Sequence, residues 1–90
     1  MSLPIADNRF VSYSPPFSVT PSASPFTYTN TTGRIAAVIV SGGTVSSITI
    51  IHAGNSIQPA LTSGTFILDL MDQLTISYTS VPSVAVIPIL

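Results

Sequence analysis

Few side chains in this sequence could perform acid–base or metal chemistry. The only histidine is His52, the carboxylates are three aspartates, and there is no cysteine. A Ser-His-Asp arrangement is formally possible, but the sequence lacks the Gly-x-Ser-x-Gly motif that marks one kind of serine nucleophile. His52, Asp69 and Asp72 could together offer nitrogen and oxygen ligands to a metal ion, although aspartates three positions apart in a connection are more typical of turns. We predict no catalytic residue, no metal, no other cofactor and no enzymatic activity.

The charge disfavours binding to nucleic acid. Two arginines, Arg9 and Arg34, are the only cations, whereas phosphate backbones require a basic surface. Gly42 and Gly43 are followed by neither a lysine nor a helical pattern, so they do not form a phosphate-binding loop. The aromatic residues could form a stacking or sugar-binding face, but their alternation along strands fits core packing better: Phe10, Tyr13, Phe17, Phe26, Tyr28, Phe66 and Tyr78.

The composition suggests a surface that partners cover. Charged residues make up 6% of the 90 residues and hydrophobic residues 46%, with a net charge of −1, while a typical soluble domain is about 25% charged. A chain of this length buries only about 60–65% of its unfolded surface, and no disulfide can stabilise it. We therefore expect it to bury further surface between subunits. The alternative is an ordinary β domain rich in serine and threonine.

Targeting and membrane signals are not expected. The first seven residues contain no basic stretch and no apolar run of signal-peptide length. The longest clean apolar run, residues 35–40, is much shorter than the roughly 20 residues of a membrane helix. We predict no membrane partner.

The first 25 residues are predicted to form an extended N-terminal arm. Five of the eight prolines lie there: Pro4, Pro15, Pro16, Pro21 and Pro25. Prolines at this spacing exclude a helix and a central strand, yet apolar residues are spread between them, so we expect short edge strands near 10–13 and 17–20. The arm should lie on its own domain or on a neighbouring one.

Residues 26–90 are predicted to form one antiparallel β domain. Residues 26–29 alternate between aromatic and hydroxyl side chains, and residues 35–41 are a continuous apolar run typical of a strand covered on both faces. Gly42 and Gly43 should form a tight hairpin that joins this run to a strand at 44–51. Further strands are expected at 57–61, 65–70 and 74–79, with turns between them. This spacing favours an all-β fold, namely a small sandwich, a jelly roll or a small barrel.

Interface residues are predicted in the arm, at Arg34 and in the C-terminal segment. Residues 84–90 are apolar on both faces and would be an aggregation-prone edge if left uncovered. They either form a subunit contact or the central strand of the domain's own sheet. Arg34 follows a turn and could bond carbonyls or an aspartate across a junction, or it could be a solvated residue. The predicted interface residues are Phe10, Tyr13, Phe17, Arg34, Val86, Ile87 and Ile89.

Three segments resemble small β modules of tailed-bacteriophage virion proteins. They are residues 28–46 (YTNTTGRIAAVIVSGGTVS), 62–68 (TSGTFIL) and 72–78 (DQLTISY). Such modules often contain the patterns N-x-T-G-R, V-S-G-G-T-V and G-D-x-(I/L)-T-(I/V)-x-Y, and the resemblance covers roughly residues 27–82. One departure is that Leu70-Met71-Asp72 stands where the modules have Pro-Gly-Asp.

The resemblance implies a structural role in a virion. The leading expectation is a capsid decoration (cement) protein on the capsid surface, assembled in the host cytoplasm, that forms a homotrimer and binds the major capsid protein across capsomers. The resemblance fits a tail, baseplate or fibre subunit with a receptor contact as well, but a chain of 90 residues with an arm favours decoration. A free carbohydrate-binding module is a further alternative, from a different functional class.

Overall fold

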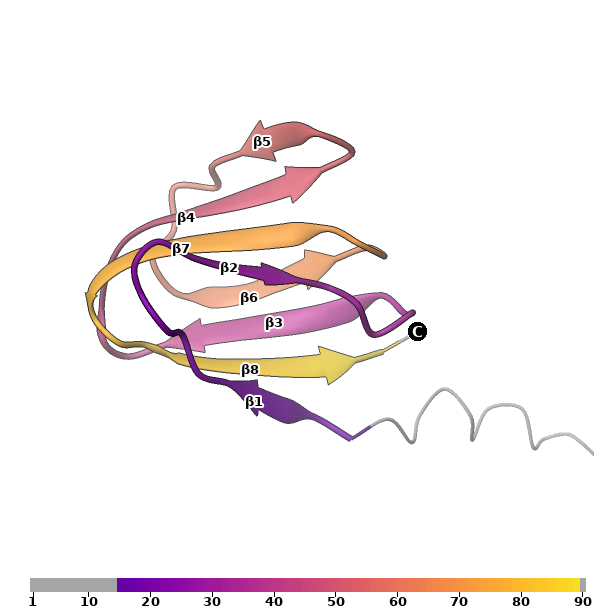
Figure 1. Ribbon diagram of the computed structural model, residues 1–90, viewed down its shortest axis with the longest axis horizontal. Coiled ribbons are helices and arrows are strands. Elements are labelled where there is room, and N and C mark those ends of the chain that lie inside the picture. The colour runs from indigo at the N-terminus through magenta and orange to yellow at the C-terminus, as the bar shows by residue number, and fades with distance from the viewer. Residues whose placement is uncertain (1–14, 90) are drawn as a thin grey trace, which may run out of the picture.

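The chain forms two antiparallel sheets that pack face to face (Figure 1). The computed structural model describes residues 15–89, and this range contains eight strands and no helix. The first sheet has the order β1 (Phe17–Val19), β8 (Ser83–Pro88), β3 (Ala36–Ser41) and β6 (Gly64–Leu68). The second has the order β2 (Phe26–Thr29), β7 (Gln73–Ser80), β4 (Thr44–His52) and β5 (Asn55–Ile57). The prediction of a small antiparallel β-sandwich is confirmed.

Alternating side chains on the inner strands form the core. In β7, Leu74 and Ile76 are fully buried, and Val84 and Val86 of β8 meet them from the other sheet. Successive residues of a strand point to opposite faces, so the period of two in the sequence decides which residues are enclosed. The core cluster draws on both sheets and consists of Ala36, Val38, Val40, Ile48, Phe66, Leu68, Leu74, Ile76, Val84 and Val86.

The Gly42–Gly43 turn connects the two sheets and does not form a hairpin. Both glycines have positive φ, +71° and +63°, but β3 pairs with β6 and β8, whereas β4 pairs with β5 and β7. The predicted hairpin between these strands is therefore wrong. Two glycines indicate that the chain reverses direction, but they do not determine whether the two strands pair within one sheet or lie in different sheets. Here the reversal lets Val40 and Ile48 both join the core, from the two sheets.

The connection from β3 to β4 lies directly against the connection from β7 to β8. A Cβ atom on Gly43 would sit 2.6 Å from the carbonyl oxygen of Ser80 and 2.7 Å from the backbone nitrogen of Pro82. This stacking follows from the register, because β3 pairs with β8 in one sheet and β4 pairs with β7 in the other. Only glycine fits at position 43.

The connection between β5 and β6 differs from the predicted strand at 57–61. The strand β5 ends at Ile57, and the residues after it cross from the second sheet to the first. Pro59 has no N–H to donate to a ladder, and Ala60 has a φ of +62°. Neither residue suits a regular strand.

Part of the predicted arm belongs to the sandwich. The strand β1 confirms the edge strand expected near 17–20, and it pairs with β8. The strand expected near 10–13 lies outside the described residues. The Ser24–Pro25 peptide bond that follows β1 is cis.

In the range that the structure describes, no helix is long and apolar enough to cross a membrane.

Candidate functional site

The outer face of the first sheet carries an aliphatic patch, which the hydroxyl residues Ser18, Ser41, Thr65 and Ser83 border. In an antiparallel pair, residues directly opposite each other lie on the same face. Ala37 of β3 stands between Ile87 of β8 and Ile67 of β6, and Ile39 of β3 stands beside Ala85 of β8. Their neighbours along each strand face the core, so these five residues face outward. We call Ala37, Ile39, Ile67, Ala85 and Ile87 the apolar outer face.

This face has no charged residue in its strands and no cover among the described residues. The sequences of β1, β8, β3 and β6 are FSV, SVAVIP, AAVIVS and GTFIL. Ile67 is 56% exposed, Ile39, Ala85 and Ile87 are half-buried, and Ala37 between Ile67 and Ile87 is buried at 8% exposure. The apolar run of β3 was predicted to be covered on both faces, but the second sheet covers only one. A partly exposed aliphatic patch on three adjacent strands is a candidate protein-binding surface.

The outer face of the second sheet is mainly polar and uncharged, with Ile51 of β4 as an aliphatic member. Thr27, Thr75 and Thr49 stand side by side on β2, β7 and β4, and the hydroxyl oxygens of Thr27 and Thr75 lie 3.0 Å apart. Ser47 and Ser77 form the next pair along β4 and β7. We call these five residues the hydroxyl outer face. Its hydroxyl groups can be solvated without charge, so the sandwich has one wettable face and one apolar face.

The predicted interface residues are distributed over both sides of the first sheet. Val86 is fully buried in the core, because β8 is an inner strand between β1 and β3. Val86 therefore has no surface for a partner, and the alternative expectation, a strand inside the domain's own sheet, describes this segment. Ile87 faces outward, and Ile89 just after β8 is 42% exposed. Phe17, on the edge strand β1, is also 42% exposed.

The other predicted interface residues lie elsewhere. Arg34 lies between β2 and β3, where its carbonyl oxygen accepts hydrogen bonds from the Asn30 side-chain nitrogen at 2.7 Å and the Thr32 hydroxyl at 3.1 Å. Phe10 and Tyr13 lie outside the described residues. Sequence reasoning missed Ile39 and Ile67, although Ile67 lies between two inward-facing residues of β6 and must therefore face outward.

A buried asparagine holds together the loops at one end of the sandwich. The side-chain nitrogen of Asn30 donates to the carbonyl oxygens of Arg34, Leu68 and Asp69 at 2.7, 3.1 and 2.9 Å. Its side-chain oxygen accepts from the backbone nitrogen and the hydroxyl of Thr32. Asn30 is completely buried, and its bonds satisfy carbonyl groups of the β2–β3 and β6–β7 connections. The role is structural.

The side chains of His52 and Asp72 are in hydrogen-bond contact. The His52 Nδ1 atom lies 2.6 Å from the Asp72 Oδ1 atom, and the His52 side chain is 54% exposed. The other carboxylate oxygen of Asp72 accepts a hydrogen bond from the backbone nitrogen of Asp69 at 2.9 Å. The Asp69 carboxylate in turn accepts one from the backbone nitrogen of Leu70 at 2.7 Å. Both aspartates thus serve as turn acceptors. No group of three metal-ligating side chains occurs in the described range.

The aromatic rings of the described residues mainly pack inward. Phe66 is 4% exposed, and Tyr28 and Tyr78 pack against the core cluster. Burial raises the pKa of the Tyr28 hydroxyl above its ordinary value of 10.0. These three rings pack in or against the core.

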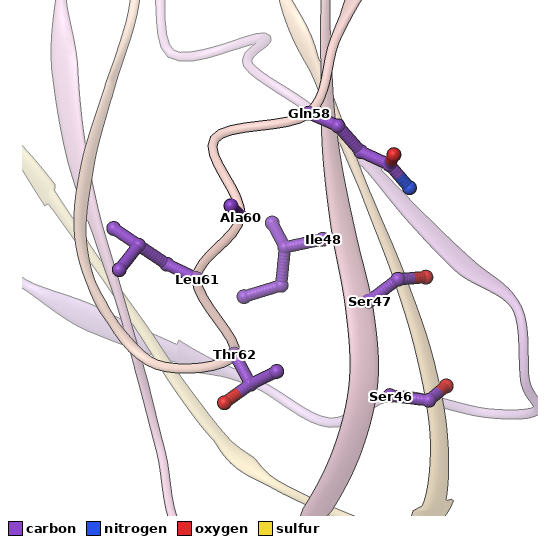
Figure 2. A pocket seen from close by; sticks show the side chains of 7 residues that line it. All are labelled: Ser46, Ser47, Ile48, Gln58, Ala60, Leu61 and Thr62. Atoms are coloured by element: carbon purple, nitrogen blue, oxygen red, sulfur yellow. The ribbon is translucent and has the colours of Figure 1, made fainter.

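A pocket of about 250 Å³ opens between β4 and the connection from β5 to β6 (Figure 2). Leu61 stands on one wall at 51% exposure, and Ile48, opposite it, is almost fully buried. The lining is uncharged and combines aliphatic side chains with hydroxyl and amide groups: Ser46, Ser47, Ile48, Gln58, Ala60, Leu61 and Thr62.

Comparison with known proteins gives no relative from which to transfer a function. No protein-family model, curated protein or solved structure matches the chain.

Proposed function

We propose that this chain is a structural protein that works by assembling with other protein surfaces through the apolar outer face. The observation that carries the proposal is the contrast between the two outer faces of the sandwich. Ile39, Ile67 and Ile87 lie outward on adjacent strands of the first sheet, whereas the outer face of the second sheet consists mainly of threonine and serine. Association with another protein surface would remove the aliphatic side chains of the first face from water.

The biological setting that we propose is a bacteriophage virion. The resemblance of residues 28–46, 62–68 and 72–78 to virion β modules supports it, as does the scarcity of charge in the whole chain. In this setting the chain is a homotrimeric capsid decoration protein on the capsid surface. Its copies associate through the apolar outer face, and the assembly stabilises the head by adding buried area across capsomers of the major capsid protein.

The size of the apolar outer face indicates that it does not act alone. The apolar outer face spans three strands of at most six residues, so at about 4.8 Å between strands and about 3.3 Å per residue its footprint is about 290 Å². A stable interface buries about 800 Å² on each partner. A second contact must therefore add to this one.

The proposal is tested by placing a charge on the apolar outer face. We expect Ile67→Lys to lower the mass of the assembly in light scattering, because association would bury the new ammonium group. Leu70→Lys is the matched control: Leu70 is 51% exposed, against 56% for Ile67, but lies on the β6–β7 turn. Circular dichroism checks that both variants fold. Equal masses for wild type and both variants would refute assembly through this face.

A further inference from the structure

The first half of β4 has an open edge. On one side β4 pairs with β7 over nearly its whole length, and on the other side it pairs with β5 only at Ile50, Ile51 and His52. Among residues 15–89, no strand pairs with residues 44–49 on that second side. Backbone N–H and C=O groups on such an edge can receive an additional strand.

The pocket lies beside this open edge (Figure 2). Ser46, Ser47 and Ile48 of β4 form one wall, and Ala60 and Leu61 belong to the opposite wall. An extended peptide bound along β4 would place side chains alternately on its two faces, so one of them could enter this pocket. The uncharged lining favours an uncharged, partly apolar segment.

We propose that the open edge of β4 binds the N-terminal segment of a second copy of this chain, which adds as a strand beside residues 44–49. This inference rests on the proposed function, because it supplies the second contact that the apolar outer face requires. The open backbone edge provides the main-chain hydrogen bonds, and the pocket provides a site for one side chain.

The N-terminal segment has the length and chemistry that the edge requires. Fourteen residues precede Pro15, and fully extended they span about 46 Å at about 3.3 Å per residue. Residues 10–14 read Phe-Val-Ser-Tyr-Ser and carry no charge. Val and the aromatic residues are strand formers, and the hydroxyl groups match the polar part of the pocket lining.

The place where the segment leaves the sandwich favours a second copy over the same copy. The strand β1 is the edge of the first sheet on the side away from β6, and Figure 1 shows β1 and β5 on opposite sides of the molecule. Pro15 and Pro16 come directly before β1 and are exposed, and proline restricts the chain to an extended path. The described chain thus enters the sandwich on the side away from its own β4 edge.

Such a contact joins two different surfaces of the chain and can be repeated from copy to copy. A head-to-tail contact of this kind gives a closed ring when the rotations that relate successive copies add up to a full turn. A closed ring of three copies satisfies every open β4 edge and agrees with the proposed homotrimer.

A cysteine cross-link tests this pairing, because the full chain contains no cysteine. Residues directly opposite each other in an antiparallel pair have Cα atoms about 4.5–5.5 Å apart, within the range that a disulfide spans. One chain carries Ser47→Cys, and a second chain, with a tag that changes its mass, carries Val11→Cys, Ser12→Cys or Tyr13→Cys. Successive positions cover both faces of the added strand. The mixture is oxidised mildly and analysed without reductant.

The matched control is Ser77→Cys. Ser77 lies opposite Ser47 on the same outer face, but on the inner strand β7, one strand further from the open edge. We expect a tagged–untagged adduct with Ser47→Cys at one or more of the three positions, and its loss with Ser77→Cys. If Ser47→Cys does not fold, Thr49→Cys on the same face of β4 replaces it.

Two results would overturn the inference. The first is no adduct with Ser47→Cys beyond that with Ser77→Cys. The second is a disulfide that forms only within one chain of a doubly substituted variant, which would place the segment on its own molecule. An assembly that loses mass with Ile67→Lys but gives no adduct would refute the strand pairing and leave assembly through the apolar outer face intact.

Discussion

Replacing Gly43 with alanine tests whether the two connections between the sheets are stacked. Gly42 and Gly43 both have positive φ, +71° and +63°, so alanine is strained to a similar degree at either position. They differ in their surroundings. A Cβ atom on Gly42 meets nothing within 4 Å, whereas one on Gly43 would lie 2.6–2.7 Å from backbone atoms of the β7–β8 connection. The two single variants therefore separate backbone strain from steric overlap.

The expected magnitudes follow from these two terms. A left-handed backbone costs a residue with a side chain about 1–2 kcal/mol, so Gly42→Ala should lower the free energy of unfolding by about that amount. Overpacking adds about 1–3 kcal/mol, so Gly43→Ala should lower it by about 2–5 kcal/mol. Each kcal/mol shifts the melting temperature of a domain of this size by about 4–8 °C.

The assay is thermal and urea unfolding followed by circular dichroism, at one protein concentration because association stabilises the folded chain. We expect the melting temperatures to fall in the order wild type, Gly42→Ala, Gly43→Ala. Equal stability of the two variants would refute the stacking of the connections. It would also revive the predicted hairpin, in which the two glycines would be nearly equivalent.

Three further substitutions test local features of the fold. Asn30→Asp should lower the free energy of unfolding by about 3 kcal/mol or more, because it places a carboxylate oxygen against three carbonyl oxygens in a buried site; unfolding in urea measures this, and unchanged stability would contradict the hydrogen-bond network. The raised pKa of Tyr28 means that the folded state favours the protonated hydroxyl, so stability should be fully present below pH 10.0 and be lost as the pH rises through the higher folded-state pKa. Tyr28→Phe should remove this alkaline loss, whereas Tyr78→Phe should leave it, and identical pH profiles of the two variants would contradict the assignment. Ala60→Gly should raise the melting temperature, because Ala60 has a φ of +62° and glycine relieves a strain of about 1 kcal/mol; a decrease would show that this strain is absent.

The strands could be predicted from the sequence because their patterns are local. Leu74-Thr75-Ile76-Ser77 alternates between apolar and hydroxyl residues, and β7 places them alternately inside and outside. The same reasoning located β2 and β3. It fails after Ile57, where the predicted strand at 57–61 contains Pro59 and Ala60 has a φ of +62°.

Pairing and register could not be predicted, because they depend on residues far apart in the chain. Ile51 pairs with Gln73, and this register brings His52 to the neighbouring Asp72, 20 positions away. The two residues were considered together only as possible ligands or catalytic partners. The apolar outer face has the same origin, since it exists only because Ile67 and Ile87 flank Ala37 across three strands.

The solution mass of the purified chain, measured by multi-angle light scattering, tests the central claim most directly. One chain has a mass of 9.4 kDa, and the account predicts a stable assembly of three chains, because a sandwich with an apolar outer face should bury that face. A well-behaved monomer across the accessible concentration range would contradict assembly through the apolar outer face and, with it, the proposed structural role.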